Sequence, residues 1–196
     1  MGRLLTRSFY ARPAEVVAPE LLGAVVEAET EQGLVAVRLT EVEAYAGEGD
    51  PASHAWRGPT PRTAVMFGPP GHVYVYFTYG MHWCANLVCA SDGEAAAVLL
   101  RGGEVVAGEH LARERRGPKP PVRLLASGPA NLARALGLDG TWHGDDVTRA
   151  RGRIRVRAGE PPVEVVAGPR VGITRAVDVP WRFSVAGDPH VSSPRP

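Results

Sequence analysis

The sequence predicts a mixed α/β fold in which strands dominate and helices pack around them. Its 196 residues suit one compact domain with a sizeable core. Hydrophobic residues make up 44% and charged residues 22%, ordinary globular values that argue against a disordered or fibrous chain. Several short segments alternate apolar and polar residues, as half-buried strands do.

The first half of the chain begins with an expected helix at Pro13–Leu22, followed by a β-hairpin. Residues 23–30 and 34–47 are the expected hairpin strands, because apolar residues recur at every second position of the later segment. Further strands are expected at 73–79 and 95–101.

The second half carries one strong helix signal, in the stretch 127–140. Ser127 can cap this helix, Pro129 suits its first turn and Gly137 can end it. Shorter apolar segments predict late strands at 154–156, 163–166, 170–173 and 183–185. The proline-rich segment 115–123 is interpreted as an exposed loop and the end, 191–196, as a frayed tail.

Membrane, metal and disulfide chemistry are not expected. No apolar run approaches the roughly 18 residues of a membrane span, and the apolar stretch near the start is too short for a secretory signal, so we expect a cytoplasmic protein. The two cysteines, Cys84 and Cys89, lie in an apolar segment at a spacing that suits neither a zinc site nor a disulfide framework. Both are expected to be buried.

One basic stripe offers a local case for nucleic-acid binding. The net charge is only +1, so the overall field gives no reason to expect such a partner. In "RARGRIRVR" arginines recur at every second position from Arg149 to Arg157, which would place them on one face of a strand. A solvated strand face and a phosphate-facing surface are equally open explanations.

Two carboxylates interrupt an apolar strand face in the segment 34–47. Its odd positions are apolar up to Leu39 and then become Glu41, Glu43 and Tyr45. A buried carboxylate is costly unless it is hydrogen-bonded or takes part in chemistry, so at least one glutamate is a candidate for an active site. The alternative is a strand that twists out into solvent and leaves both glutamates exposed.

Aromatic residues crowd the stretch "GHVYVYFTYGMHWCANL". Alternation along a strand would place Tyr74 and Tyr76 on one face and direct Tyr79 to the other. If the first face lines a cavity that contains Glu43 and Tyr45, Tyr76 can stack on a nucleobase and Tyr79 can act as an exposed wedge. Packing of these rings in a sheet core is the simpler alternative.

The loop before this stretch contributes a histidine. His54 lies in "DPASHAWRGPTPR", whose tryptophan, arginines and turn formers are typical of an ordered functional loop. No partner at metal-ligand spacing accompanies it. We therefore expect His54 to be a pocket residue and not a zinc ligand.

These residues carry a resemblance to a known family. The stretches "TEVEAYAG", "DPASHAWRGPTPRTAVMFGPPGHVYVYFTYGMHWCANLV" and "AAAVLLRG" resemble the alkyladenine (3-methyladenine) DNA glycosylases, especially their bacterial members. The similarity continues through "LASGPANLARALGL" and "RVGITRAVDVPWRFSVAGDPHVS" and so covers nearly the whole chain. It implies a single DNA glycosylase domain over residues 1–196, an α/β fold built on a curved, largely antiparallel β-sheet with surrounding helices.

The resemblance assigns three residues to catalysis. Glu43 matches the general base that deprotonates the attacking water. Arg101 matches a residue that helps to position this water, and Val171 matches a residue whose backbone carbonyl contacts it.

The resemblance also assigns the residues that handle the base. Tyr45 and His54 match one wall of a stack around the flipped base, and Tyr76 matches the opposite wall. Tyr79 matches the side chain that fills the gap left in the duplex, and Asn86 matches the residue that obstructs the amino group of normal guanine.

The implied function is excision of damaged bases from DNA. The family flips alkylated purines such as 3-methyladenine and 7-methylguanine out of duplex DNA and hydrolyses the N-glycosidic bond, with hypoxanthine and ethenoadenine as further candidate bases. The resemblance implies a monomer that acts on double-stranded DNA without a metal or other cofactor and leaves an abasic site. An alkylated purine is already a cationic leaving group, so a carboxylate that activates water and aromatic faces that hold the base meet the main chemical needs.

Two other classes stay open on the residues alone. A non-catalytic nucleic-acid-binding module would use the arginines and tyrosines but has no reason to place Glu43 beside them, where it would repel phosphate. A hydrolase of glycosides or free nucleosides would use the carboxylates but has no use for an outward Tyr79.

Overall fold

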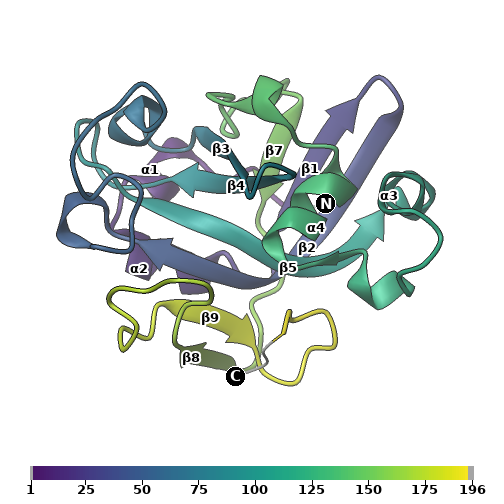
Figure 1. Ribbon diagram of the computed structural model, residues 1–196. Coiled ribbons are helices and arrows are strands. Elements are labelled where there is room, and N and C mark those ends of the chain that lie inside the picture. Colours follow the sequence, from purple (N-terminus) through teal and green to yellow (C-terminus); the bar gives the residue numbers. More distant parts are fainter. Residues whose placement is uncertain (1, 194–196) are drawn as a thin grey trace.

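Nine antiparallel strands form one sheet in the computed structural model, which describes residues 2–193 (Figure 1). The strands are β1 Val25–Thr30, β2 Gly33–Tyr45, β3 Val73–Thr78, β4 His82–Val88, β5 Ala97–Ala107, β6 Ala126–Ser127, β7 Ile154–Arg157, β8 Val165–Gly168 and β9 Arg182–Val185. The α-helices among these residues are α1 Arg7–Tyr10, α2 Ala14–Glu20, α3 Glu109–Arg116 and α4 Pro129–Leu136. Short 3-10 helices are η1 Gly47–Gly49, η2 Ala64–Phe67, η3 Val122–Leu124 and η4 Gly140–Trp142.

The main strand order is β3-β4-β5-β2-β1-β7, and the sheet curves until its two ends approach each other. The edge residue Val73 of β3 exchanges backbone hydrogen bonds of 2.8 Å with Gly144 and Asp145, which lie on the segment that leads to β7. Helix α4 packs on β4 and β5, and α2 packs on β2 and β5 (Figure 1). The expected α/β domain on a curved, largely antiparallel sheet is therefore confirmed. No described helix has the length and apolar character that a membrane crossing requires.

The alternation of residues along the central strands separates the core from a second face. In β3 the apolar Val73 and Val75 belong to the main core, whereas Tyr74 and Tyr76 lie on the other side with a smaller apolar cluster around Met66. The same alternation holds in β4 and β5, where the core residues are Ala85, Leu87, Val98 and Leu100. The expectation that Tyr74 and Tyr76 share one face of β3 is thus confirmed, and both cysteines are buried and free as expected.

Several expected elements are wrong in their details. Ser127 does not cap α4, because it lies in β6 opposite Gly102 and leaves Gly128, with φ +96°, at the helix start. Residues 170–173 form no strand, since Arg170 turns inward to a buried partner, Asp50. The sequence patterns also missed β4 and α3, and α3 includes the first two residues of the expected loop 115–123.

The strand β2 changes face at a bulge. Its core residues are odd-numbered up to Leu39 but become Val42 and Ala44 afterwards, and the pairing with β5 is shifted between Leu39 and Val42. A Cβ at Gly103, on the facing strand, would lie 2.4 Å from the carbonyl oxygen of Arg38, so only glycine permits this close approach. The bulge directs Glu43 away from the core while keeping it buried. The alternative of two solvent-exposed glutamates is therefore wrong.

Glu41 is the centre of a buried ion-pair cluster. Its Oε1 accepts hydrogen bonds from Nε of Arg101 (2.9 Å) and Nε of Arg182 (2.7 Å). The backbone N–H of Ser192 donates to Oε2 at 2.7 Å, and its hydroxyl lies 3.0 Å from Oε1. Val191 and Ser192 are each only 5% exposed. The expectation of a frayed tail is thus wrong for these two residues, because both are buried and the contacts of Ser192 with Glu41 fasten the chain to β2; residues 194–196 lie outside the described part.

The basic stripe is largely neutralised by carboxylates. Arg155 pairs with Glu27 and Glu29 on the neighbouring strand β1, and Arg157 also pairs with Glu27. Arg149 and Arg153 pair with Asp146 and Asp145, respectively. Only the last residues of the stripe lie on a strand, because β7 begins at Ile154. These ion pairs favour a solvated protein surface, in which carboxylates balance the arginines, over a surface that faces phosphates.

We predict that Glu41→Gln destabilises the protein by about 3 to 5 kcal/mol, because it leaves two buried guanidinium groups without their full counter-charge. Glu104→Gln provides the matched control, since Glu104 pairs with Arg38 across the same two strands but at the exposed end. Loss of this exposed ion pair should lower the free energy of unfolding by about 1 kcal/mol or less. Urea unfolding monitored by fluorescence measures both, and equal losses for the two variants would contradict this account of the cluster.

Candidate active site

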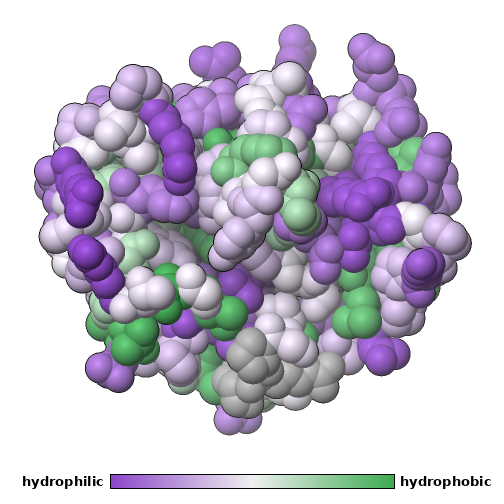
Figure 2. All heavy atoms as spheres, in the orientation of Figure 1, coloured by the Kyte–Doolittle hydropathy of each residue, from purple (hydrophilic) through white to green (hydrophobic). Residues whose placement is uncertain are grey.

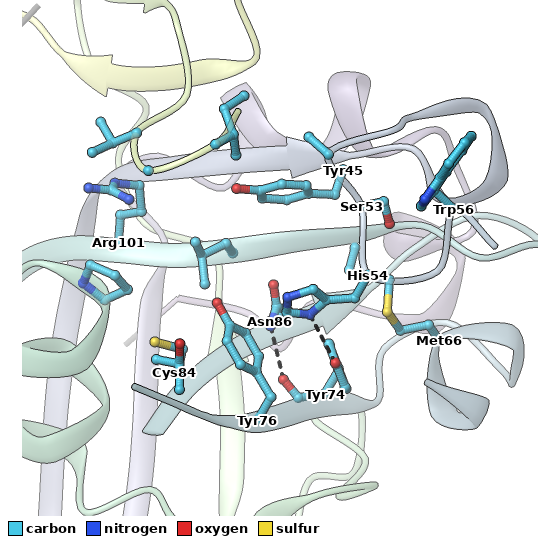
Figure 3. Close-up of a pocket in the computed structure, with 18 of the residues that line it drawn as sticks. Tyr45, Ser53, His54, Trp56, Met66, Tyr74, Tyr76, Cys84, Asn86 and Arg101 are labelled. Carbon is cyan, nitrogen blue, oxygen red and sulfur yellow. Dashed lines mark hydrogen bonds between the residues drawn. The ribbon is translucent and has the colours of Figure 1, made fainter. Parts of the chain in front are cut away.

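A cavity of about 470 Å³ opens on the face of the sheet opposite the main core. Strands β2, β3, β4 and β5 supply its floor and walls, and the loops after β2 and β8 supply its rim. Figure 3 shows its principal side chains. The structure brings most of the expected site residues into its lining, namely Tyr45, His54, Tyr76, Tyr79, Asn86, Arg101 and Val171.

Glu43 lies directly beneath this cavity and is completely buried. Its Oε2 accepts a hydrogen bond of 2.9 Å from the hydroxyl of Tyr45, and its Oε1 accepts one of 2.7 Å from the backbone N–H of Val171. Nη1 of Arg101 lies 3.4 Å from Oε1. These three neighbours all line the cavity, so Glu43 sits behind the wall at the point where they meet. The N–H of Val171 is occupied by Glu43, whereas the contact of its carbonyl with the attacking water stays a prediction.

Glu41 and Glu43 have opposite pKa shifts although they are two residues apart. Burial alone would raise the pKa of Glu41, but Arg101, the N–H and hydroxyl of Ser192, and Arg182 outweigh it and hold this pKa below its usual value. Burial raises the pKa of Glu43 above its usual value despite the opposing effects of Arg101 and its two hydrogen bonds. Glu41 is therefore a fixed structural anion, whereas Glu43 has gained affinity for a proton.

Three aromatic rings surround the open space. Tyr45 is held from β2 with its ring 4.7 Å from the guanidinium carbon of Arg170. His54 and Tyr76 meet edge to face, with ring centroids 4.6 Å apart and planes at 88°. Figure 3 shows Tyr45 on one side of the hollow and His54 beside Tyr76 on the other. The resemblance assigned His54 and Tyr76 to opposite walls of the stack. In the structure these two rings are in direct contact.

Tyr74, which the sequence reasoning gave no role in the site, fixes His54. Its hydroxyl lies 3.0 Å from Nδ1 of His54 and accepts a hydrogen bond from Nε of Arg62 at 3.1 Å. His54 keeps an exposed edge, but the partial loss of water at the cavity wall, together with the charge of Arg62, lowers its pKa to about 4. His54 is therefore a neutral ring at physiological pH.

Tyr79 and Asn86 occupy opposite extremes of exposure. Tyr79 is 82% exposed and lies in the turn after β3 with φ +52°, a left-handed conformation that few non-glycine residues adopt. The turn, and not strand alternation, sets its direction, so it lies at the cavity rim instead of on the opposite face. Asn86 is buried on the floor, where its side-chain amide donates to the carbonyl oxygen of Tyr74 at 3.1 Å (Figure 3).

A second buried ion pair fastens the loops that form the rim. Arg170 binds both carboxylate oxygens of Asp50, at 2.5 and 2.9 Å, and also donates to the carbonyl oxygen of Ala44 at 2.9 Å. This fork joins the loop that carries His54 to the loop that carries Val171. Neither partner had a recognisable signal in the sequence, because they lie 120 residues apart.

The described residues contain no group of three or more His, Cys, Asp or Glu side chains that could hold a metal ion. The chemistry of the cavity is instead that of a buried carboxylate beside neutral aromatic rings. Such an arrangement can accept a proton from water while holding a flat, electron-poor ring against the aromatic faces.

Comparison with known proteins agrees with this chemistry. Methylpurine-DNA glycosylase is the family whose profile matches residues 8–189. A curated protein of Cutibacterium acnes, named "Putative 3-methyladenine DNA glycosylase", is 54% identical over 189 residues, which cover 93% of this chain and 96% of the relative. Proteins of the same name from Streptomyces avermitilis and Frankia casuarinae are 52% and 53% identical; each match covers 96% of this chain, and 90% and 92% of the respective relative. The chain belongs to the methylpurine-DNA glycosylase family.

Proposed function

We propose that this protein flips alkylated purines, such as 3-methyladenine and 7-methylguanine, out of duplex DNA and hydrolyses the bond between base and sugar. The family makes it a DNA glycosylase for alkylated bases, a hydrolase of N-glycosidic bonds. The observation that carries the proposal is Glu43, a carboxylate with a raised pKa buried beneath an aromatic cavity. No cofactor takes part, and the product is an abasic site.

The proposed reaction consumes one water molecule. The glycosidic C–N bond breaks and its electron pair passes to the base, which neutralises the positive charge of the alkylated ring. The water oxygen bonds to C1′ of the sugar, and its proton moves to Glu43. A general base of this kind contributes about 10² to 10⁴ in rate, and its raised pKa brings it nearer to the working pH, where proton acceptance is most effective.

The neighbours of Glu43 serve this step. Arg101 and Val171 hold the carboxylate in place and help to position the water beside it. The guanidinium group also stabilises the ionised form of Glu43, so the carboxylate is both buried and available as a base. A carboxylate near C1′ further stabilises the positive charge that develops on the sugar as the base departs.

The aromatic residues hold the flipped base. Tyr45, His54 and Tyr76 supply stacking faces, which attract a cationic purine through their π-electrons. The low pKa of His54 matters here, because a protonated ring would repel the positive charge of the base. Asn86 stands on the cavity floor, where it would meet the amino group of normal guanine.

The exposed Tyr79 enters the duplex in place of the flipped nucleotide. Its position in a tight turn at the cavity rim lets it project while the base lies in the cavity. We propose that the enzyme acts as a monomer on double-stranded DNA in the bacterial cytoplasm.

Replacement of the proposed base tests the function. Glu43→Gln keeps the shape of the side chain but cannot accept the proton, so we expect release of 3-methyladenine from methylated duplex DNA to fall at least a hundredfold. Binding to a duplex with a stable abasic analogue should persist, and Glu104→Gln should release the base at the parental rate. A loss within about tenfold, or only about 1.4 kcal/mol, would contradict the role of Glu43.

The same assay separates the rival classes. A non-catalytic module would release no base at all, and a nucleoside hydrolase would prefer the free methylated nucleoside to the duplex. Release from the duplex in preference to the nucleoside is the expected result.

The two tyrosines should respond differently to the form of the DNA. Tyr76→Ala removes a stacking face and should lose roughly 1 to 3 kcal/mol of base binding in duplex and single-stranded DNA alike. Tyr79→Ala removes the wedge, so its defect should be large in duplex and small in a single strand, where little stacking is lost. Single-turnover excision on both substrates gives a ratio for each variant, in which general destabilisation largely cancels. If the ratio of the duplex rate to the single-strand rate were the same for both variants, Tyr76 and Tyr79 would not have separate roles in base stacking and duplex wedging.

A further inference from the structure

An exposed tryptophan at the cavity mouth carries two arginines. Trp56 is 38% exposed, and the guanidinium carbons of Arg57 and Arg175 lie 5.8 and 5.4 Å from the centre of its ring. Both distances are within the range of a cation–π contact. All three residues line the cavity, although Arg175 comes from the loop between β8 and β9 and the other two from the loop after β2. The two rim loops thus meet at a cationic, aromatic corner.

The positive charges of Arg57 and Arg175 are not neutralised by any described carboxylate. Neither has a hydrogen bond or ion pair with any described residue, and both side chains belong to exposed positions. Nearby Arg101 and Arg170 are buried and paired with carboxylates, so they cannot serve an external anion in the same way. Figure 2 shows strongly hydrophilic side chains along the left edge of this face, over the loops drawn in blue in Figure 1.

We propose that Arg57 and Arg175, positioned by Trp56, bind the backbone phosphates on either side of the flipped nucleotide. This inference rests on the proposed function, because it needs a nucleotide whose base lies in the cavity. The phosphates of such a nucleotide remain at the mouth, since they are joined to the sugar and not to the base. A guanidinium group binds phosphate through two parallel N–H donors, and such contacts fix position without reading sequence.

Contacts with the phosphates at the cavity mouth would fix the position of the sugar for the reaction. The cations lie at the mouth, and the carboxylate of Glu43 lies behind the wall that Tyr45, Arg101 and Val171 form. A nucleotide held by its phosphates at the mouth and by its base among the aromatic rings has its sugar suspended between the two. Trp56 is a positioning residue in this arrangement, because its ring holds two like charges close together where otherwise they would separate.

The salt dependence of binding tests the proposal. Affinity for a duplex with one tetrahydrofuran abasic analogue is measured by fluorescence anisotropy over a range of salt concentrations. Each arginine that neutralises one phosphate contributes about 0.9 to the slope of log affinity against log salt. We expect Arg57→Ala and Arg175→Ala each to lower the slope by about 0.9. The exposed Arg123 of η3 does not line the cavity, so Arg123→Ala should leave the slope unchanged.

Replacement of the tryptophan separates positioning from charge. Trp56→Ala keeps both arginines, so affinity should fall at least threefold at fixed salt, and Trp56→Phe should restore most of it. Unchanged slopes in both arginine variants, or a slope lowered equally by Arg123→Ala, would overturn the proposal. Release of 3-methyladenine by the parental protein is measured alongside: failure of that release refutes the proposed function, whereas unchanged slopes in a protein that does release the base refute only the phosphate contacts.

Discussion

Arg101 is shared by two buried carboxylates, and the site depends on how it is shared. Its Nε donates to Glu41 at 2.9 Å, whereas its Nη1 lies 3.4 Å from Glu43. Glu41 also receives Arg182 and Ser192, so its charge is fully compensated and its pKa falls. Arg101 also acts to lower the pKa of Glu43, but burial outweighs Arg101 and the hydrogen bonds from Val171 and Tyr45, so this pKa rises. The additional contacts from Arg182 and Ser192 thereby distinguish Glu41, a structural anion, from Glu43, the proposed base on the same strand.

The surrounding structure serves to keep these charges in place. The bulge in β2 lets both carboxylates be buried without entering the apolar core, and the chain end near Ser192 closes the cluster from the side. Because Glu43 and Arg101 lie on adjacent strands of the sheet, the proposed catalytic carboxylate is held by a rigid part of the fold. The loops above supply what must contact the substrate, and the Asp50–Arg170 fork ties those loops together.

Local patterns in the sequence predicted the parts of the site that lie within single elements. Alternation placed Tyr74 and Tyr76 on one face of β3, and the interruption of an apolar face marked Glu41 and Glu43 as candidates, between which only the family resemblance chose Glu43. Two partners of Glu41, Arg182 and Ser192, escaped prediction, since Ser192 lies 151 residues from Glu41 and carries no periodic signal. The bulge also escaped, because it depends on close approach of a second strand. Tyr79 was expected on the wrong face, since a left-handed turn ends the alternation there.

Carbon NMR of the side-chain carboxyl groups measures whether the pKa values of Glu41 and Glu43 shift in opposite directions. The protein is labelled at glutamate and titrated with acid, and the signals of Glu41 and Glu43 are assigned by their absence from the respective Gln variants. We expect Glu43 to take up its proton at a pH above the ordinary glutamate pKa of about 4.3 and Glu41 to do so below it. A Glu43 that titrates at or below the ordinary value, or below Glu41, would contradict the account.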